Sequence, residues 1–237
     1  CEMIAAEGFR VIRFDNRDVG LSSKLEGVDY TLADMADDAV AVLDAAGVDR
    51  AHVLGASMGG MIVQRLAIDH PDRLRTVTSV MSRTGERGYG ESSPEALELL
   101  MAKPAAGREE AIERAVLQSR VWGSKPEWAT EDEVRAKAAE LYDRCFYPEG
   151  IARQMRAIMA DGSRTEALRS VTVPMLVLHG SRDTLIDPSG GRRTAEVVPG
   201  ARYVELEGMG HDLVRALWRP LLDEWLAFVR EVEPASA

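Results

Sequence analysis

The sequence predicts an α/β fold in which a mostly parallel sheet is flanked by helices and carries a helical insertion. In both halves of the chain, short apolar segments alternate with amphipathic helical segments, which is typical of a parallel sheet covered on both faces. Between residues 83 and 169 the strand signals disappear, and helical segments follow one another with polar joints. We therefore expect core structure over residues 1–82, a helical lid over 83–169 and the rest of the core over 170–237.

Five β-rich apolar segments account for the predicted sheet. Each is short and is followed by a loop containing glycine, serine, aspartate or asparagine, as expected for strands buried in a sheet. The expected strands are residues 9–14, 51–55, 76–81, 173–178 and 201–206.

Helices are expected between and after these strands. Thr31 is a suitable N-cap for the helix that begins near Ala33, and Gly47 is suitable for ending it. The last helix contains Pro220, which predicts a kink. The expected helices are residues 1–7, 33–46, 58–69, 94–101, 109–121, 131–144, 151–159, 188–197 and 213–232.

The composition of the 237 residues excludes several classes of protein. Hydrophobic residues make up 46%, with 20 glycines and 10 prolines, which argues against collagen-like, coiled-coil and disordered chains. No apolar run approaches the roughly 20 residues that a membrane span needs. The formal net charge of −10 disfavours binding to nucleic acid or an anionic membrane, because both need a positive field.

The cysteines and the first residue add two expectations. Cys1 and Cys145 are far apart and lack metal-ligand spacing, so neither a disulfide framework nor a structural zinc site is expected. The chain opens inside a helical segment and does not begin with methionine, which predicts that a preceding part is missing.

The sharpest motif is Gly55-Ala56-Ser57-Met58-Gly59, which lies between an expected strand and an expected helix. A serine on such a strained turn exposes its hydroxyl group above the sheet, and small residues two positions to either side let strand and helix approach. Ser57 is therefore the candidate nucleophile. The backbone amide of Met58 is the candidate donor of an oxyanion hole.

A nucleophilic serine needs a base, and His211 is the best candidate among four histidines. It lies between the last expected strand and the last helix, in the sequence Gly208-Met209-Gly210-His211-Asp212. His52 begins a buried strand, His70 ends a helix and His179 shapes a turn, so we interpret these three as structural.

The acid that orients the imidazole should also follow a strand. Asp183 does so directly after residues 173–178, within Gly180-Ser181-Arg182-Asp183. Asp187 is the competing candidate, but it precedes Pro188 at the start of a helix, where capping accounts for it.

The order Ser57, Asp183, His211, each on a loop after its own strand, resembles the α/β-hydrolase superfamily of serine hydrolases. Residues 14–22, FDNRDVGLS, are similar to the corresponding loop of the aclacinomycin-methylesterase-like group. The resemblance covers essentially the whole chain. It implies an α/β-hydrolase fold with a nucleophile elbow and a helical lid, and hydrolytic chemistry with a Ser-His-Asp triad.

The resemblance also implies parts that the sequence lacks. In the family, a strand and a His-Gly-type loop precede the first helix, and that loop supplies the second oxyanion amide. The missing strand would lie between residues 9–14 and 51–55, so we expect a gap in the sheet or re-pairing there. Loss of one oxyanion donor costs about 2.7–4 kcal/mol in a comparable enzyme, so we expect this fragment to be nearly inactive.

The resulting hypothesis is a cytoplasmic esterase that cleaves a small carboxylic ester through an acyl-serine intermediate. No metal or organic cofactor is expected, the partner is a small-molecule substrate, and the oligomeric state is left open. The alternatives are C–C bond hydrolysis, thioester hydrolysis, cofactor-free perhydrolysis and a non-catalytic ligand-binding module. Arg17 and Asp18 are expected to pair within their loop. Candidates for the apolar lining of the pocket are Trp122, Trp128, Phe146, Tyr147 and Met155.

Overall fold

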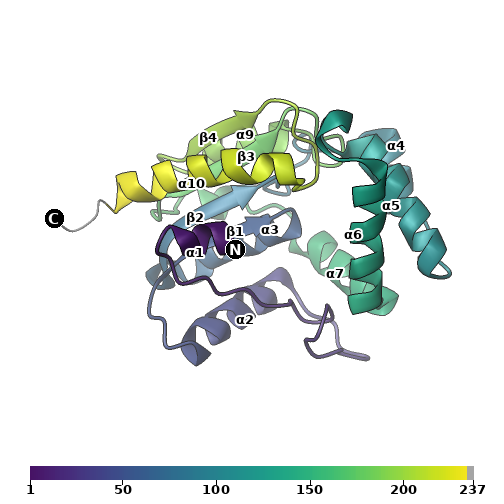
Figure 1. The fold of residues 1–237 in the computed structure, drawn as a ribbon. Helices are drawn as coiled ribbons and strands as arrows, with labels where there is room; N and C mark the ends of the chain where they lie inside the picture. The colour runs from purple at the N-terminus through teal and green to yellow at the C-terminus, as the bar shows by residue number, and fades with distance from the viewer. Residues whose placement is uncertain (234–237) are drawn as a thin grey trace.

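A computed structural model describes residues 1–233 and contains a sheet of four parallel strands in the order β1–β2–β3–β4 (Figure 1). Because the strands are parallel, their carboxyl ends lie at one edge, and the loops that follow β1, β3 and β4 meet there. The strands are β1 (Ala51–Ala56), β2 (Leu74–Val80), β3 (Met175–Gly180) and β4 (Arg202–Leu206).

Helices account for most of the remaining chain. Within residues 1–233, none of them combines the length and apolar character that crossing a membrane would take. The α-helices are α1 (Glu2–Ala6), α2 (Leu32–Ala45), α3 (Met58–Asp69), α4 (Pro94–Leu100), α5 (Arg108–Trp122), α6 (Glu131–Arg144), α7 (Pro148–Asp161), α8 (Thr165–Leu168), α9 (Ser189–Val197) and α10 (Trp218–Val232). The short 3₁₀ helices are η1 (Pro71–Arg73), η2 (Pro126–Trp128) and η3 (Arg215–Leu217).

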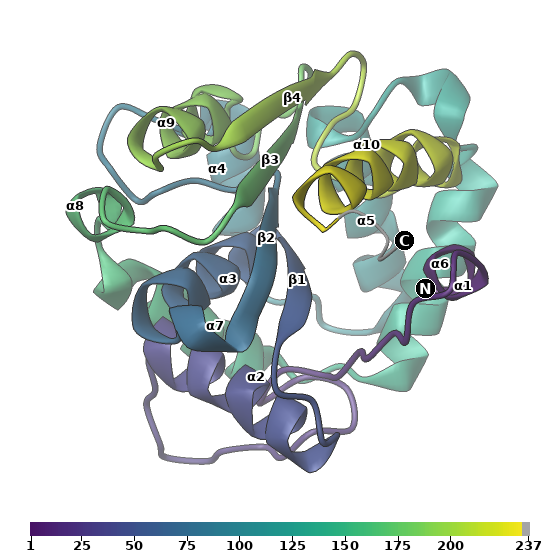
Figure 2. The ribbon, with the colours of Figure 1, turned by 90° about the vertical axis from the view of Figure 1, so that its left-hand side faces the viewer.

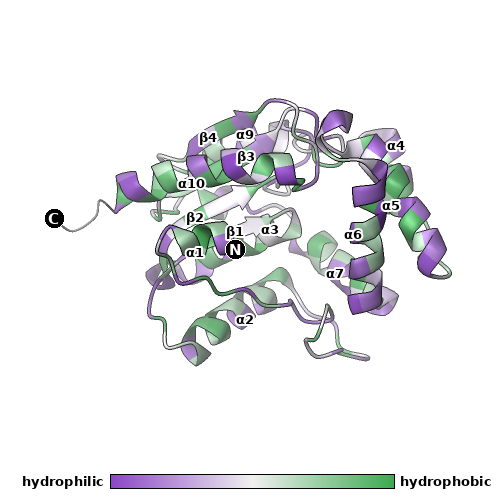
Figure 3. Ribbon diagram, viewed as in Figure 1, coloured by the Kyte–Doolittle hydropathy of each residue, from purple (hydrophilic) through white to green (hydrophobic). Residues whose placement is uncertain are grey.

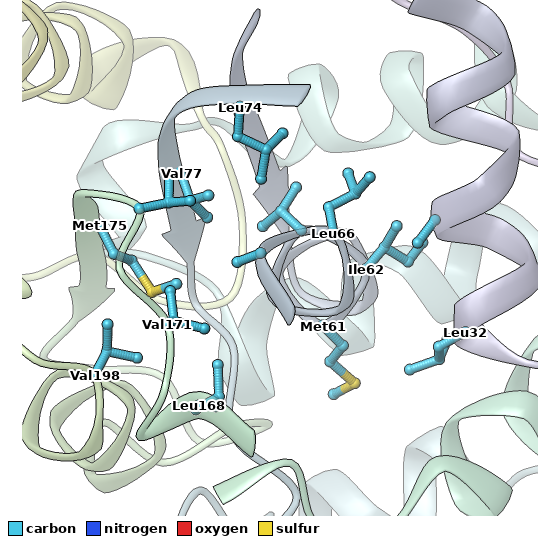
Figure 4. Packing of buried hydrophobic residues seen from close by; sticks show 14 of the residues in the cluster. Leu32, Met61, Ile62, Leu66, Leu74, Val77, Leu168, Val171, Met175 and Val198 are labelled. Atoms are coloured by element: carbon cyan, nitrogen blue, oxygen red, sulfur yellow. The ribbon is translucent and has the colours of Figure 1, made fainter. Parts of the chain in front are cut away.

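One face of the sheet is covered by α2, α3, α8 and α9. Figure 4 shows Met61, Ile62 and Leu66 around α3, with Val77 and Met175 of the strands directed into the same cluster. These side chains are at most 5% exposed. Their burial removes apolar surface from water and so fixes α3 against the sheet.

The other face is covered by α10 and α1, which lie across the sheet from α3 and α9 (Figure 2). Helix α10 buries Leu222, Trp225 and Val229 against Leu176 and Leu178 of β3. Figure 3 shows the amphipathic character of α10, with hydrophobic and hydrophilic segments alternating along the ribbon. Both faces of β2 and β3 are therefore covered, which explains why these strands are apolar on both sides, whereas Leu54 of β1 is 49% exposed.

The chain between β2 and β3 forms five α-helices, α4 to α8, and α5 and α6 lie beyond one end of the sheet (Figure 1). Threonine capping starts α6: the Thr130 hydroxyl accepts a hydrogen bond from the Glu133 amide, and the Glu133 carboxylate accepts one from the Thr130 amide. The division of the chain into a core and a lid at residues 83 and 169 stays a prediction.

The expected strand over residues 9–14 is wrong, because this segment has no regular secondary structure. A strand is stabilised by a hydrogen-bonded neighbour, and among the described residues β1 pairs with β2 alone. Within the part of the chain that the structure describes, the sheet ends at β1, so neither the expected gap nor the expected re-pairing is found. Phe9 instead packs edge-on against Trp225, with ring centroids 4.9 Å apart, and against His52 at 6.1 Å.

The kink at Pro220 was expected for a helix that begins at Leu213, but α10 begins at Trp218. Pro220 is the third residue of the helix. Proline is tolerated in the first turn, because the amides there have no carbonyl partner within the helix.

Candidate active site

Ser57 occupies a strained turn between β1 and α3. Its backbone has φ 55° and ψ −118°, a conformation that residues with a side chain rarely adopt. The Ser57 amide donates to the Val80 carbonyl oxygen at 2.9 Å, and the Ser82 hydroxyl donates to the Ser57 carbonyl oxygen at 2.8 Å. Both bonds come from the end of β2, so the neighbouring strand holds the turn in place.

The glycines around Ser57 do not share one role. A Cβ atom on Gly55 would lie 2.0 Å from the carbonyl oxygen of Gly59, and one on Gly60 would lie 2.4 Å from Cβ of Ser82. A Cβ atom on Gly59 would meet nothing within 4 Å. The expectation that small residues are needed two positions to either side of Ser57 is therefore wrong for Gly59, and the second tight contact belongs to Gly60.

The loops after β3 and β4 bring Asp183 and His211 to Ser57. Nε2 of His211 lies 2.9 Å from Oγ of Ser57, and Nδ1 of His211 lies 2.7 Å from Oδ2 of Asp183. The three residues are separated in the chain but meet at the carboxyl edge of the sheet. Oδ2 of Asp183 can only accept, so Nδ1 of His211 carries the proton and the Nε2 lone pair faces the serine.

Asp183 is buried and surrounded by donors. Its Oδ1 accepts hydrogen bonds from the amides of Leu185 at 3.0 Å and Ile186 at 2.8 Å. Burial by itself raises the pKa of Asp183, but the hydrogen bonds from His179, from His211 and from the Ile186 amide lower it, and the resulting pKa lies below 3.8. The carboxylate is therefore ionised at neutral pH.

His179 contributes more than the turn that the sequence predicts. Its Nε2 lies 2.8 Å from the carbonyl oxygen of Ile186 and 3.3 Å from Oδ2 of Asp183, and its side chain is fully buried. Strand β3 and the loop after β4 therefore each present one imidazole to the Asp183 carboxylate. The position of His179, four residues before Asp183 at the end of a strand, is the signal that could have identified this contact.

Asp187 has different surroundings. Its Oδ1 accepts from the Ser189 amide at 2.9 Å, but the N-cap position of α9 is Pro188 and not Asp187, one residue later than the sequence predicts. Met58 is the first residue of α3, so its amide is one of those that no carbonyl of the helix can accept. Its role as oxyanion donor stays a prediction.

An apolar groove with a volume of about 520 Å³ lies beside the segment that follows His211, residues 212–215, and neither His211 nor Ser57 lines it. Trp122 and Trp128 line it, as expected. Phe146 stacks on Tyr142 at 4.5 Å, Tyr147 accepts a hydrogen bond from Arg153, and Met155 lies in α7; none of these three lines the groove. The lining residues are Ala115, Gln118, Ser119, Trp122, Trp128, Ala129, Glu133, Val134, Lys137, Ala138, Leu141, Asp212, Leu213, Val214, Arg215 and Trp218.

The parallel sheet, the strained serine turn after β1 and the loops after β3 and β4 together form the architecture of an α/β-hydrolase. Residues 2–214 match the family model described as alpha/beta hydrolase fold. The chain therefore belongs to the alpha/beta hydrolase fold family and is a hydrolase of the aclacinomycin-methylesterase-like group.

Relatives support this assignment. The chain is 34% identical to a rhodomycin D methylesterase of Streptomyces sp. strain C5 over 242 residues, which cover 93% of this chain and 81% of the relative. It is 29% identical to a putative carbamate hydrolase of Caulobacter sp. strain K31, over 81% of this chain and 70% of the relative.

Solved structures show the same fold. The enol-lactonase from Burkholderia xenovorans LB400 superposes with a TM-score of 0.73 at 26% identity, covering 97% of this chain and 83% of that one. A hydrolase from Pseudomonas aeruginosa PA01 superposes with a TM-score of 0.71 at 26% identity, covering 99% and 85%.

Proposed function

We propose that the protein hydrolyses a carboxylic ester through an acyl-enzyme intermediate on Ser57. The observation that carries the proposal is the 2.9 Å separation of Ser57 Oγ and His211 Nε2, with Asp183 on the other imidazole nitrogen. A serine hydroxyl is a poor nucleophile at neutral pH unless a base removes its proton during attack. His211 is in position to be that base.

The reaction has two halves. In the first, Ser57 Oγ attacks the ester carbonyl carbon while His211 takes its proton, and the tetrahedral intermediate collapses as His211 returns the proton to the departing alcohol. In the second, water attacks the acyl-serine and gives its proton to His211, and the carboxylic acid leaves as His211 returns that proton to Ser57 Oγ. Asp183 keeps Nδ1 protonated and stabilises the imidazolium that forms in each half.

The negative charge on the tetrahedral intermediate needs hydrogen-bond donors in place before the reaction begins. We assign the Met58 amide to this role, because the start of α3 presents unpaired amides and the positive end of the helix dipole next to Ser57. One such donor contributes on the order of 10²–10³ in kcat in a comparable enzyme.

The groove supports a substrate with an apolar part. Trp122 and Trp128 offer flat apolar surfaces, and its volume of about 520 Å³ falls within the range of small-molecule sites. The rhodomycin D methylesterases among the relatives make methyl esters the first compounds to test. A cytoplasmic location stays a prediction.

A fluorophosphonate probe, which reacts with activated serines, tests the proposal directly. We expect the full-length protein to be labelled, and Ser57→Ala and His211→Ala in that protein to lose the label and to lower ester hydrolysis by about 10⁴-fold or more. Matched controls are Ser170→Ala, whose hydroxyl donates to the Ala167 carbonyl oxygen, and His70→Ala, whose imidazole contacts Asp37. Labelling that persists in folded Ser57→Ala would refute the assignment of the nucleophile.

A panel of esters graded by acyl size then defines the substrate class. We expect activity on methyl esters with an apolar acyl part that fits the groove. Equal turnover of all acyl sizes would argue against the groove as the acyl site.

A further inference from the structure

The loops that carry Asp183 and His211 both contact the C-terminal end of α5. The last carbonyl groups of a helix have no donors within the helix and need partners elsewhere. The carbonyl oxygen of Val121 accepts from the Thr184 hydroxyl at 2.8 Å, and that of Trp122 accepts from the His211 amide at 2.6 Å. One helix end is thus bonded to the residue after Asp183 and to His211 itself.

The three residues after α5, 123–125, add further bonds to the loop around His211. The Ser124 hydroxyl accepts from the Gly210 amide at 2.9 Å and donates to Asp212, and the Ser124 amide donates to Asp212 Oδ2 at 3.0 Å. The Lys125 amide donates to the Gly208 carbonyl oxygen at 2.9 Å. The residues on both sides of His211 are therefore hydrogen-bonded to Ser124.

The two segments also touch backbone to backbone. A Cβ atom on Gly210 would lie 2.2 Å from the carbonyl carbon of Gly123 and 2.3 Å from the Trp122 carbonyl oxygen. A side chain there would have to push backbone aside, so the close approach depends on glycine at this position. Ser124 is buried, which places its hydrogen bonds away from competing water.

We infer that the end of α5 and residues 123–125 hold the acid and base loops in register, with Thr184, Ser124 and Asp212 as positioning residues. This inference rests on the proposed roles of Asp183 and His211. An imidazole that transfers protons must be placed accurately, and a misplacement of about 1 Å can cost about 10²-fold in rate. Trp122 also lines the groove, so the helix that contacts the proposed substrate is the one that positions the base.

Substitutions at Thr184 separate positioning from packing. Thr184→Val keeps the shape and removes the donor to Val121, whereas Thr184→Ser keeps the hydroxyl group. We expect Thr184→Val to lower kcat about 10-fold or more with KM changed less than threefold, and Thr184→Ser to stay within about threefold of the unchanged protein. The rate of fluorophosphonate labelling of Ser57 should fall in parallel with kcat.

Ser124→Ala removes the hydroxyl group that is hydrogen-bonded to both Gly210 and Asp212. We expect kcat to fall about 10- to 100-fold with KM changed less than threefold. Ser170→Ala is the matched control for a lost serine hydroxyl. Thr130→Ala, which removes the cap of α6 in the same helical region, is the control for general loosening and should lower the melting temperature without lowering kcat.

The outcomes are distinguishable. No labelling of the unchanged, folded protein would refute the proposed function. Labelling of the unchanged protein, with kcat retained in both Thr184→Val and Ser124→Ala, would overturn the positioning role alone. A fall in kcat in Thr130→Ala equal to that in Ser124→Ala would also overturn it, because loss of stability would then be a sufficient explanation.

Discussion

Asp183 and Asp187 lie four residues apart on one loop, and their surroundings give them different chemistry. Asp183 is buried, accepts hydrogen bonds from two backbone amides and contacts two imidazoles, whereas Asp187 is exposed and accepts from the Ser189 amide at the start of a helix. A buried carboxylate that stays ionised needs such donors, because burial alone favours its neutral form. The donors around Asp183 therefore fit it to stabilise a charged His211.

Paired substitutions test this difference. We expect Asp183→Asn to lower kcat on the order of 10⁴-fold, because an amide at this position no longer holds the imidazole in the tautomer that accepts the serine proton. Asp187→Asn should leave kcat within about twofold. Steady-state kinetics on the same ester would measure both, and equal losses in the two variants would contradict the assignment of the acid.

The sequence was sufficient to predict that Ser57, Asp183 and His211 lie together, because each follows a strand and parallel strands end at one edge of a sheet. It was not sufficient for Ser124, whose contacts with the loop around His211 depend on how a helix 86 to 88 residues earlier is placed. It was also not sufficient for most of the pocket, because aromatic residues of helices pack on one another as readily as they line a groove.

At the scale of elements, the turn between β1 and α3 depends on contacts that a single methyl group would break. Gly55 and Gly60 face backbone or Ser82 at distances far below van der Waals contact, whereas Gly59 faces open space. The three glycines differ because α3 begins directly after β1, which brings Gly55 and Gly60 against neighbouring atoms and leaves Gly59 facing open space.

Alanine substitutions at these glycines give a test with an internal control. We expect Gly55→Ala and Gly60→Ala to lower the free energy of unfolding by about 1–3 kcal/mol, because backbone and a packed strand must move to admit the methyl group. Gly59→Ala should change it by less than about 1 kcal/mol. Urea denaturation measures all three, and equal losses at Gly59 and Gly60 would show that the tight contact is not the cause.

Elements that carry their own local signals were predictable, and those that depend on a partner were not. Thr31 caps α2 as predicted, since its hydroxyl accepts from the Asp34 amide and the Asp34 carboxylate accepts from the Thr31 amide. Residues 9–14 have strand-like composition but no strand beside them, so composition alone misleads. Likewise, the position of Pro220 is harmless only because the helix begins later than its apolar pattern suggests.

At the scale of the whole molecule, ion pairs join segments that are remote in the chain. The prediction that Arg17 and Asp18 pair within their loop is wrong. Arg17 binds Asp38 of α2, with nitrogen–oxygen distances of 2.6 and 2.8 Å, and Asp18 binds Arg153 of α7 at 2.7 and 3.0 Å. The N-terminal loop is thereby fixed to two helices, one of them 135 residues away.

The Asp18–Arg153 pair is buried, and both carboxylate oxygens of Asp18 accept hydrogen bonds from Arg153. Asp18 also accepts from the Tyr30 hydroxyl at 2.9 Å and the Leu25 amide at 2.7 Å. Its hydrogen bonds, those from Arg153 above all, lower the pKa of Asp18 to about 2 in spite of burial, which raises it. A carboxylate with a lowered pKa stabilises the fold above its unfolded value of 3.8, and this contribution is lost as the pH falls through 2.

Asp18→Asn therefore has a stability cost that depends on pH. Asparagine keeps the size of the side chain and tolerates the φ of 68° at this position, but it leaves Arg153 without its counter-charge. We expect the free energy of unfolding at pH 7 to fall by about 2 kcal/mol, which is the usual contribution of hydrogen bonds to a charged group. The difference from the unchanged protein should narrow as the pH falls from 4 towards 2.

Asp15→Asn is the matched control, because Asp15 lies in the same loop and pairs with Arg144 at the surface, at 2.6 and 3.0 Å. Solvent screens that pair, so the substitution should cost less than about 1 kcal/mol at pH 7. Urea denaturation at pH 7 and at several values down to pH 3 compares the two. Equal losses of stability in both variants at every pH would show that the buried Asp18–Arg153 pair contributes no more than the surface pair, which would contradict this prediction.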